Sequence, residues 1–151
     1  DAYSLSKWVN ELTCDAFHRA YGVTTAALRF GSVWSESQYR QTIEKGLEPT
    51  AAWSDMLYTW VHVLDITAGI RQALEEPNLP GHGVYTLNAS DTRCLEPTME
   101  LLEKFRPDYL SVLTAPIAGH DALISTEKAR KAFGFQPVYR LDEARKRTAE
   151  K

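Results

Sequence analysis

Cysteine is scarce in this sequence, which has only Cys14 and Cys94 among its 151 residues. Two cysteines cannot build a disulfide framework, and a structural zinc site needs four ligands at short spacings. The sequence therefore argues against proteins stapled by disulfides or zinc. We expect no metal site, and a reducing, cytoplasmic environment.

Concentrated positive charge is also missing. Lys and Arg total 17 against 20 Asp and Glu, which gives a net charge of −3, and the longest basic block is the triplet at 145–147. Nucleic acids and anionic membranes both attract proteins through clustered positive charge. The apolar stretches fall far short of the ~20 residues of a membrane-spanning helix. We therefore expect neither a nucleic-acid partner nor a membrane partner.

An initiator methionine does not open the chain, which begins at Asp1 and enters a helical pattern within three residues. The composition, 44% hydrophobic and 25% charged, is that of an ordinary globular domain. We interpret the chain as part of a longer protein.

The first thirty residues predict a helix followed by a strand. Apolar residues recur every three or four positions from Tyr3 to Tyr21, which indicates a helix with one buried face. Gly22 stands where a left-handed helix end is expected. The apolar segment 23–30 is typical of a buried parallel strand. Helix, tight stop and strand form the second half of a β-α-β unit.

The rest of the sequence continues to alternate between the two kinds of element. Helices are expected over 37–45, 66–76, 97–106, 125–133 and 141–150, and short strands over 60–63, 84–87 and 111–114. Asp65 is interpreted as an N-cap rather than a functional acid, and His62 as a structural histidine. This alternation predicts an α/β fold.

One pair of residues suggests chemistry. Tyr3 and Lys7 are four positions apart near the start of the first helix, so their side chains lie on one face, one turn apart. A cation within ~4–6 Å stabilises a phenolate and lowers a tyrosine pKa from its usual ~10, and a helix N-terminus acts in the same direction. Such a tyrosine can exchange a proton with a hydroxyl or carbonyl oxygen, as hydride transfer requires. The alternative is a chance pairing on a helix surface.

Five segments in order resemble the C-terminal half of the extended short-chain dehydrogenases/reductases, the NAD-dependent epimerase/dehydratase family. These segments are YSLSK (3–7), LRFGSV (28–33), WVHVLD (60–65), GVYTLN (83–88), and STEKAR with FGFQP (125–130 and 133–137). A Tyr-x-x-x-Lys pair alone is a weak signal. Five elements in the family's order, spanning nearly the whole chain, are a strong one.

The resemblance implies a specific organisation. The chain would hold the C-terminal part of a Rossmann-like doubly wound domain plus a smaller, substrate-binding α/β domain. Residues 1–35 would be the last helix and strand of the dinucleotide-binding domain. Residues 36–151 would form the substrate-binding region, with 60–76 packing back on the Rossmann part.

The resemblance also implies an oxidoreductase site that uses NAD or NADP. Tyr3 would be the catalytic acid/base, and Lys7 would hydrogen-bond the nicotinamide ribose while assisting Tyr3. The residues expected to contact nicotinamide and substrate are Phe30, Gly31, Ser32 and Val33. Trp34 follows them and is a candidate for substrate binding, with core packing as the alternative. The first helix is expected to form a homodimer in the intact protein.

Two family features are not found in this sequence. The first is the N-terminal half with its glycine-rich phosphate loop, so the chain alone is expected to be inactive. The second is an arginine that often precedes the aromatic-x-His-Val element and can hold a diphosphate; here the residues are 57–59, Leu-Tyr-Thr. This favours a free sugar, a uronate or a similar polar alcohol or carbonyl as substrate. The alternative is a catalytically silent fragment or a binding module without a dinucleotide site.

Overall fold

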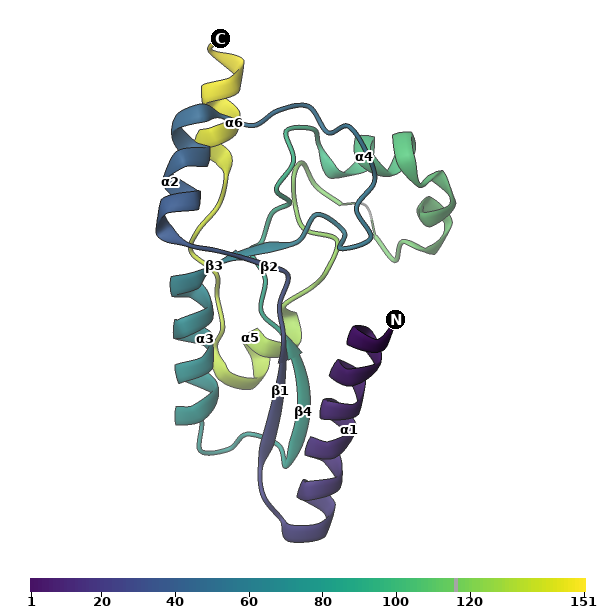
Figure 1. Ribbon diagram of the computed structural model, residues 1–151, viewed down its shortest axis with the longest axis vertical. Coiled ribbons are helices and arrows are strands. Elements are labelled where there is room, and N and C mark those ends of the chain that lie inside the picture. The colour runs from purple at the N-terminus through teal and green to yellow at the C-terminus, as the bar shows by residue number, and fades with distance from the viewer. Residues whose placement is uncertain (116) are drawn as a thin grey trace.

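Helices and short parallel strands alternate in the computed structural model, which describes residues 1–115 and 117–151 (Figure 1). The helices are α1 (Ala2–Tyr21), α2 (Glu36–Lys45), α3 (Val63–Glu75), α4 (Thr98–Phe105), α5 (Glu127–Phe133) and α6 (Asp142–Ala149), with a 3-10 helix, η1, over Pro107–Val112. The strands are β1 (Thr25–Arg29), β2 (Ser32–Trp34), β3 (Trp60–His62) and β4 (His82–Thr86). The expected α/β class is confirmed.

The strands form two parallel pairs. β1 pairs with β4, so that Arg29 lies opposite Thr86. β2 pairs with β3, so that Trp34 lies opposite His62. Because only residues 30–31 separate β1 from β2, the chain passes directly from one pair into the other. The carboxyl ends of β1 and β4 therefore lie where the two pairs meet.

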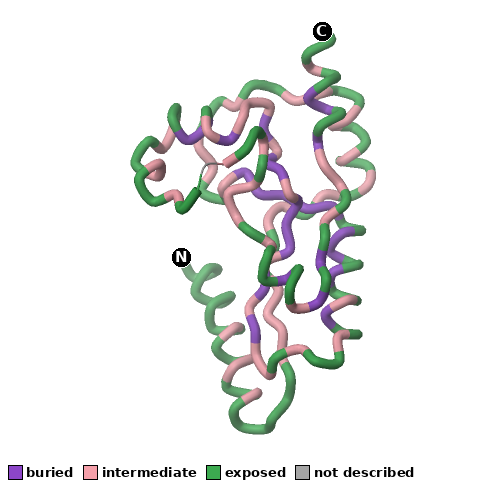
Figure 2. Tube along the Cα trace, turned by 180° about the vertical axis from the view of Figure 1, so that it is seen from behind, coloured by how far each residue is buried: buried purple, intermediate pink, exposed green. Residues whose placement is uncertain are grey.

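The core lies on one side of the β1–β4 pair and extends into the loops beyond β3. Figure 1 shows α3 and α5 on one side of this pair and α1 on the other. Buried side chains of α3, β4 and α5, among them Ala73, Tyr85 and Phe133, pack together. Figure 2 shows that burial continues through β3 and the segments near α4 and α6. α1 lies outside this core.

The expectation of one buried face on α1 is wrong for the chain as described. No residue of α1 is buried, and its large apolar side chains are exposed. The half-buried face is polar instead: Glu11 accepts two hydrogen bonds from the Arg29 guanidinium, both 2.6 Å, and Thr25 donates to the Cys14 carbonyl. α1 is therefore attached by polar contacts, and its apolar residues lack a partner in the part of the chain that the structure describes.

Local signals placed most helix ends correctly. Gly22 ends α1 in the left-handed conformation with φ 67°, and Gly134 ends α5 with φ 76°. Ser35 caps α2 through a reciprocal pair of hydrogen bonds with Gln38. The strand expected over 111–114 is wrong, since residues 107–112 form the 3-10 helix η1.

The N-cap expected at Asp65 is also wrong. α3 begins two residues earlier, and its N-cap is His62, whose Nδ1 accepts a hydrogen bond from the Leu64 N–H at 3.2 Å. Asp65 is buried inside α3, where its carboxylate accepts from the backbone N–H groups of Val138 and Tyr139. The carboxylate thus ties α3 to the segment before α6.

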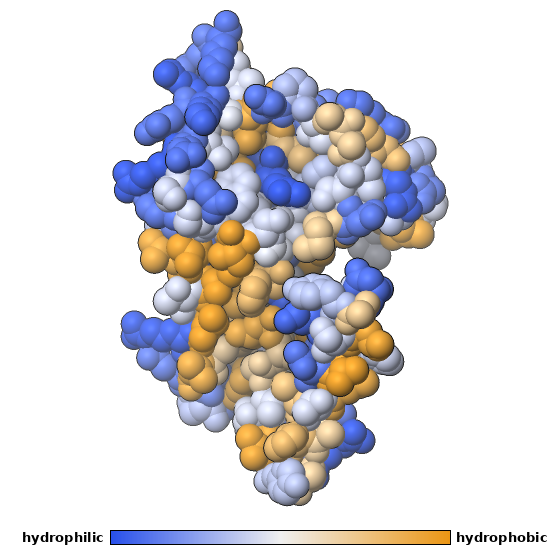
Figure 3. Space-filling view, in the orientation of Figure 1, coloured by the Kyte–Doolittle hydropathy of each residue, from blue (hydrophilic) through white to orange (hydrophobic). Residues whose placement is uncertain are grey.

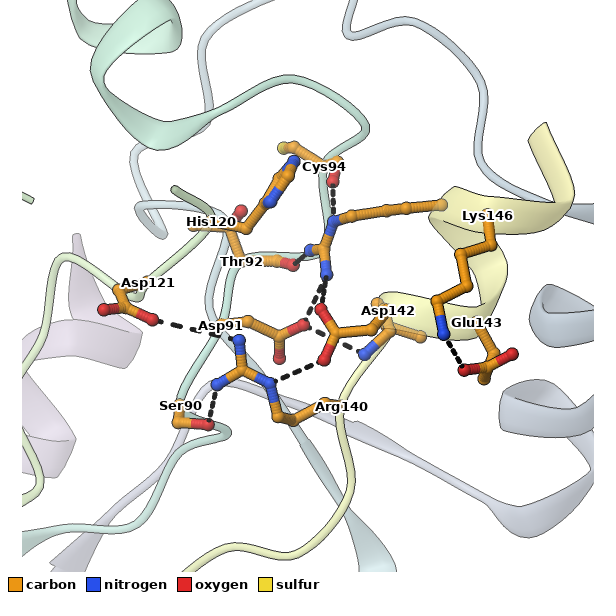
Figure 4. A network of polar contacts seen from close by, with 12 residues as sticks. Ser90, Asp91, Thr92, Cys94, His120, Asp121, Arg140, Asp142, Glu143 and Lys146 are labelled. Carbon is orange, nitrogen blue, oxygen red and sulfur yellow. Dashed lines mark hydrogen bonds and ion pairs between the residues drawn. The ribbon is translucent and has the colours of Figure 1, made fainter. Parts of the chain in front are cut away.

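A buried polar network attaches α6 to the loop after β4 (Figure 4). Arg145 of α6 is only 8% exposed and donates to the Asp91 carboxylate at 2.7 Å and to the Cys94 carbonyl at 3.0 Å. Asp91 is fully buried and also accepts from the Leu141 N–H at 2.9 Å. Every charge in this centre is paired, as burial requires.

Candidate functional site

The Tyr3–Lys7 pair lies beyond the carboxyl ends of β1 and β4, on the side of the sheet where these strands finish. The Glu11–Arg29 contact places Glu11 level with the last residue of β1. Tyr3 precedes Glu11 by eight residues, and a helix rises 1.5 Å per residue, so Tyr3 lies about 12 Å beyond that level. Figure 1 shows the N-terminal end of α1 at the end of the sheet where β1 and β4 finish. Ligands of open α/β sheets bind at this end.

Lys7 lies close to the tyrosine ring. Its Nζ is 5.2 Å from the centroid of the Tyr3 ring, within the range of a cation–π contact. Asp1 caps the helix by accepting from the Ser4 N–H at 2.7 Å. The Tyr3 side chain is 71% exposed, and within the described residues Lys7 has no ion-pair partner. Both functional groups are therefore open to a ligand.

A cavity of about 220 Å³ lies at the same end of the strands. Its walls include Phe30 and Gly31, which follow β1, Asn88, which lies just beyond β4, and residues 55–57 together with Thr59. We call it the strand-end cavity. It is built from the ends of two parallel strands and from the turn that precedes β3.

A glycine is required at position 31, where the turn that precedes β3 approaches the end of β1. A Cβ atom at this position would overlap the Thr59 side chain and backbone. The Gly31 N–H donates to Asn88 Oδ1 at 2.7 Å, and the Thr59 hydroxyl donates to the Met56 carbonyl at 2.7 Å. These contacts hold the cavity wall against the end of β1.

The turn over residues 54–59 has an unusual backbone. Leu57 and Tyr58 have φ angles of 52° and 55°, in the left-handed region that non-glycine residues seldom occupy. The Leu57 N–H donates to the Ser54 carbonyl, and the buried Tyr58 donates its hydroxyl to the Ala52 carbonyl at 2.9 Å. Desolvation raises the pKa of Tyr58. Strain of this kind persists where surrounding contacts enforce it, and it is concentrated at functional sites.

Among the described residues, neither metal-binding groups nor cysteine thiols contribute to this site. Within residues 1–115 and 117–151, no group of three or more His, Cys, Asp or Glu side chains is arranged to hold a metal ion. Cys94 is buried, and desolvation raises the pKa of its thiol, which disfavours the thiolate. None of the helices in residues 1–115 and 117–151 is both long and apolar enough to cross a bilayer.

Comparisons with known proteins identify the fold. No family model matches the sequence. An uncharacterised protein of Methanocaldococcus jannaschii is 24% identical over 157 residues, which cover 96% of this chain and 48% of that protein. A monomeric L-threonine 3-dehydrogenase from a metagenome superposes with a TM-score of 0.56 at 17% identity, over 99% of this chain and 56% of that one.

A UDP-glucuronic acid 4-epimerase from Bacillus cereus, solved with UDP-glucuronic acid and NAD, superposes with a TM-score of 0.55 at 18% identity. The match covers 98% of this chain and 51% of the epimerase. The chain has the fold of the extended short-chain dehydrogenases/reductases. It spans about half the length of the relatives it matches.

Within this extended short-chain dehydrogenase/reductase fold, the residues expected to form the site fall into three groups. Tyr3 and Lys7 lie together on α1. Phe30 and Gly31 line the strand-end cavity. The structure places residues 32–33 in β2, where they do not line that cavity.

Trp34 is separated from the other expected site residues. It packs against Trp60 with ring centroids 4.9 Å apart, and it lines a different groove of about 610 Å³ with Gln38 and Gln41 of α2. The two cavities share no lining residue. In this dehydrogenase/reductase fold, Trp34 therefore packs against the buried Trp60 and does not line the strand-end cavity.

Of the lining residues, only Phe30 and Gly31 were expected from the sequence, and the polar residues that were missed include Asp55 and Asn88. Asn88 lies in the GVYTLN segment immediately beyond β4, so its position at a strand end was a usable signal. Asp55 gave no signal, because its place in the cavity depends on the left-handed turn at residues 57–58.

Proposed function

We propose that this chain is the C-terminal half of an NAD(P)-dependent oxidoreductase of the epimerase/dehydratase type. Tyr3 acts as the acid/base and Lys7 as its partner. The observation that carries the proposal is the position of this pair beyond the carboxyl end of a parallel strand pair, the same end as the strand-end cavity. The decisive test is hydride transfer in a Tyr3→Phe variant, where loss of turnover with retained cofactor binding supports the proposal.

The residues of the chain suit the nicotinamide end of a dinucleotide. When bound, the dinucleotide supplies a hydride acceptor or donor. Lys7 carries three N–H donors on a flexible stem, which fits the paired hydroxyls of a ribose. The Tyr3 oxygen accepts the hydroxyl proton when an alcohol is oxidised and returns it when a carbonyl is reduced. Phe30 and Gly31, which line the strand-end cavity, would contact the substrate and the nicotinamide when these are bound.

We propose the domain division expected from the sequence. Residues 1–35 contribute a helix and strand to the dinucleotide-binding domain, and residues 36–151 form the substrate-binding region, with 60–76 packing on the Rossmann part. Two surfaces support packing against a Rossmann part outside this chain, and β4 (82–86) shares the sheet of β1 across the proposed boundary. β1 is paired along one edge only in the described chain, and apolar side chains gather over α3 and along α1 (Figure 3). Further strands and helices of a doubly wound sheet would cover both surfaces.

The substrate we propose is a free polar alcohol or carbonyl, such as a sugar, rather than a diphosphate-linked one. An arginine before β3 would hold a diphosphate through two parallel hydrogen bonds. Tyr58 lies two residues before β3 instead and is buried, with its hydroxyl directed to a backbone carbonyl. It supplies neither charge nor a free donor to this region.

The chain alone is expected to bind NAD and NADP negligibly. Dinucleotide affinity depends on a phosphate-binding loop and the helix N-terminus behind it. The described residues contain no such loop, since the closely spaced glycines Gly81 and Gly83 lie just before and within β4 rather than between a strand and a helix N-terminus, and no third glycine follows before α4. Isothermal titration calorimetry of the 151-residue chain checks this. A micromolar dissociation constant would contradict the two-half organisation, whereas a protein that also contains the dinucleotide-binding half should bind.

We further propose that α1 forms the centre of a homodimer in the intact protein. Trp8 and Phe17 are more than half exposed on this helix, and a two-fold contact needs a self-complementary apolar surface. Light scattering of the intact protein is expected to give a dimer, and Trp8→Glu is expected to give a monomer. The matched control is Val112→Glu, which places the same charge on an exposed apolar residue of η1. A monomeric intact protein at high concentration would contradict the proposal.

A catalytically silent fragment or binding module is the second candidate. The separation of Trp34 from the strand-end cavity is the observation that favours it. The reading frame upstream of Asp1 distinguishes the two: a glycine-rich phosphate loop encoded there supports the enzyme, and a natural start codon directly before the Asp1 codon supports the module.

A further inference from the structure

The strand-end cavity contains one acidic side chain that has no partner among the residues described, 1–115 and 117–151. Its two charged lining residues are Arg29 and Asp55. Arg29 is already engaged by Glu11 through two hydrogen bonds of 2.6 Å. This contact lowers the pKa of Glu11 and raises that of Arg29, which keeps both groups ionised. Asp55 has no hydrogen bond or ion pair to any side chain that the structure describes, so its negative charge is not compensated at the cavity.

The turn over residues 54–59 fixes where this charge sits. Asp55 is exposed, whereas Tyr58 and Thr59, three and four residues later, are buried. Backbone hydrogen bonds close the turn on both sides of Met56, from the Leu57 N–H to the Ser54 carbonyl and from the Thr59 N–H to the Met56 carbonyl. Because the turn is anchored at its buried end, its backbone keeps residue 55 in the cavity wall.

The other lining groups offer no positive charge to an anionic ligand. The Asn88 carbonyl oxygen is occupied by the Gly31 N–H, and the Thr59 hydroxyl proton is donated to the Met56 carbonyl. Phe30, Met56 and Ile124 contribute apolar surface. The cation in the lining is Arg29, whose charge is already balanced by the Glu11 carboxylate. A ligand carboxylate or phosphate placed here would therefore lose water without gaining an uncompensated cation. A hydroxyl or ammonium group would gain an ionised acceptor.

We propose that Asp55 makes the strand-end cavity select alcohol or carbonyl substrates without negative charge, namely neutral or amine-bearing sugars, and exclude carboxylates and phosphates. This inference rests on the proposed function and narrows it. Of the substrates that the sequence leaves open, a uronate is disfavoured and a neutral sugar is retained. Asp55 is a specificity-determining residue and takes no part in proton transfer.

The test uses sugars that differ only in the charge at carbon 6. In the gluco, galacto and manno series, the 6-amino-6-deoxy sugar, the neutral hexose and the uronate are offered to the protein that carries both halves, with NAD or NADP. The variant is Asp55→Asn, which keeps the shape and removes the charge. The control is Glu48→Gln, which removes the same charge from an exposed residue that lines the other groove.

In the Asp55→Asn variant, kcat/KM for the uronate relative to the neutral hexose is expected to rise about tenfold at low salt, because a like charge a few ångströms away is removed. The rise should shrink as ionic strength increases, since an exposed charge is screened. Glu48→Gln should leave the ratio unchanged. The amine-bearing sugar should lose kcat/KM relative to the neutral hexose in Asp55→Asn alone.

The possible results distinguish failure of the role of Asp55 from failure of the proposed oxidoreductase function. If the wild type and Asp55→Asn turn over sugars with the same ratio of kcat/KM for the uronate to kcat/KM for the hexose, the role of Asp55 is overturned. The proposed oxidoreductase function would then still stand. An equal change in Glu48→Gln also overturns it, because net charge would then be the cause. Failure to oxidise any sugar of the three series contradicts the proposed function, and the inference fails with it. Melting temperatures of both variants equal to that of the wild type would show that the substitutions leave the fold intact.

Discussion

Replacing Arg145 by alanine is expected to lower the free energy of unfolding of this chain by about 3–5 kcal/mol. The guanidinium is the partner of the fully buried Asp91 carboxylate, at 2.7 Å, and it also satisfies the carbonyls of Thr92 and Cys94. Removing it leaves an unpaired charge in the interior together with two carbonyls that have lost a donor. Both changes are costly because neither group can reach bulk water.

Arg147 provides the matched control for this prediction. It lies on the same helix, is exposed, and forms only a 3.5 Å surface ion pair with Glu150. Arg147→Ala is therefore expected to change stability by less than about 0.5 kcal/mol. Urea unfolding followed by circular dichroism measures both variants, with equal slopes as the condition for comparing midpoints. Equal midpoints for Arg145→Ala and Arg147→Ala would contradict the structural role of the network.

A double variant separates the cost of breaking the pair from the worth of the pair itself. Asp91→Leu with Arg145→Met replaces both buried charges by apolar side chains of similar size. Such replacements are often neutral or stabilising, because the desolvation penalty of both ions disappears. We expect the double variant to be more stable than Arg145→Ala.

The elements that local sequence determines were the ones predicted well. The period of apolar residues from Tyr3 to Tyr21 predicts α1 to within one residue of its start, and Gly22 marks its end because a left-handed residue costs glycine little. The helix expected over 37–45 is found as α2 one residue earlier, and its start is set by a capping box of Ser35 and Gln38 that was not predicted. These signals depend on neighbours within four residues and require no knowledge of the fold.

Features that depend on distant residues were not predicted. Asp91 and Arg145 are 54 positions apart, and Arg145 stands in a charged stretch that resembles an exposed helix. Asp65 follows a plausible helix start, yet its acceptors are used by backbone groups more than 70 residues away. The buried face expected on α1 was wrong because the polar contacts to β1 face inward and the described chain contains nothing to cover the apolar face.

Only part of the candidate site could be predicted, because some of its residues are brought together by contacts between distant parts of the sequence. Tyr3 and Lys7 are neighbours along one helix, so their proximity followed from spacing alone, and the structure brings them together. Trp34 is adjacent in sequence to the cavity residues, but the strand β2 turns it toward Trp60. Asp55 reaches the cavity through left-handed residues that sequence propensities disfavour.

Replacing Tyr3 by phenylalanine is expected to remove most turnover from the protein that carries both halves. Loss of a positioned acid/base costs ~10²–10⁴ in rate, equivalent to about 3–5 kcal/mol of transition-state stabilisation. Cofactor binding should remain nearly intact, because only the proton-transferring oxygen is removed. Lys7→Ala should weaken both cofactor binding and turnover. Lys7→Arg should not restore both, since a planar guanidinium does not reproduce the geometry of a compact ammonium toward a ribose.

Tyr21 offers a matched control on the same helix. Tyr3 and Tyr21 are 71% and 73% exposed and lie near opposite ends of α1, so Tyr21→Phe removes an equally exposed phenol from the end remote from the strand-end cavity. Any effect of losing a surface hydroxyl on stability or solubility should be the same in both variants. Only the loss of proton transfer should be specific to Tyr3.

The most direct measurement is the single-turnover rate of reduced nicotinamide formation at saturating cofactor and substrate, compared among wild type, Tyr3→Phe and Tyr21→Phe. The account predicts a rate ~10²–10⁴ lower in Tyr3→Phe, an unchanged rate in Tyr21→Phe, and equal cofactor dissociation constants in all three proteins. A near-normal rate in Tyr3→Phe would contradict the account and leave the Tyr3–Lys7 pair as a coincidence of spacing on a helix surface.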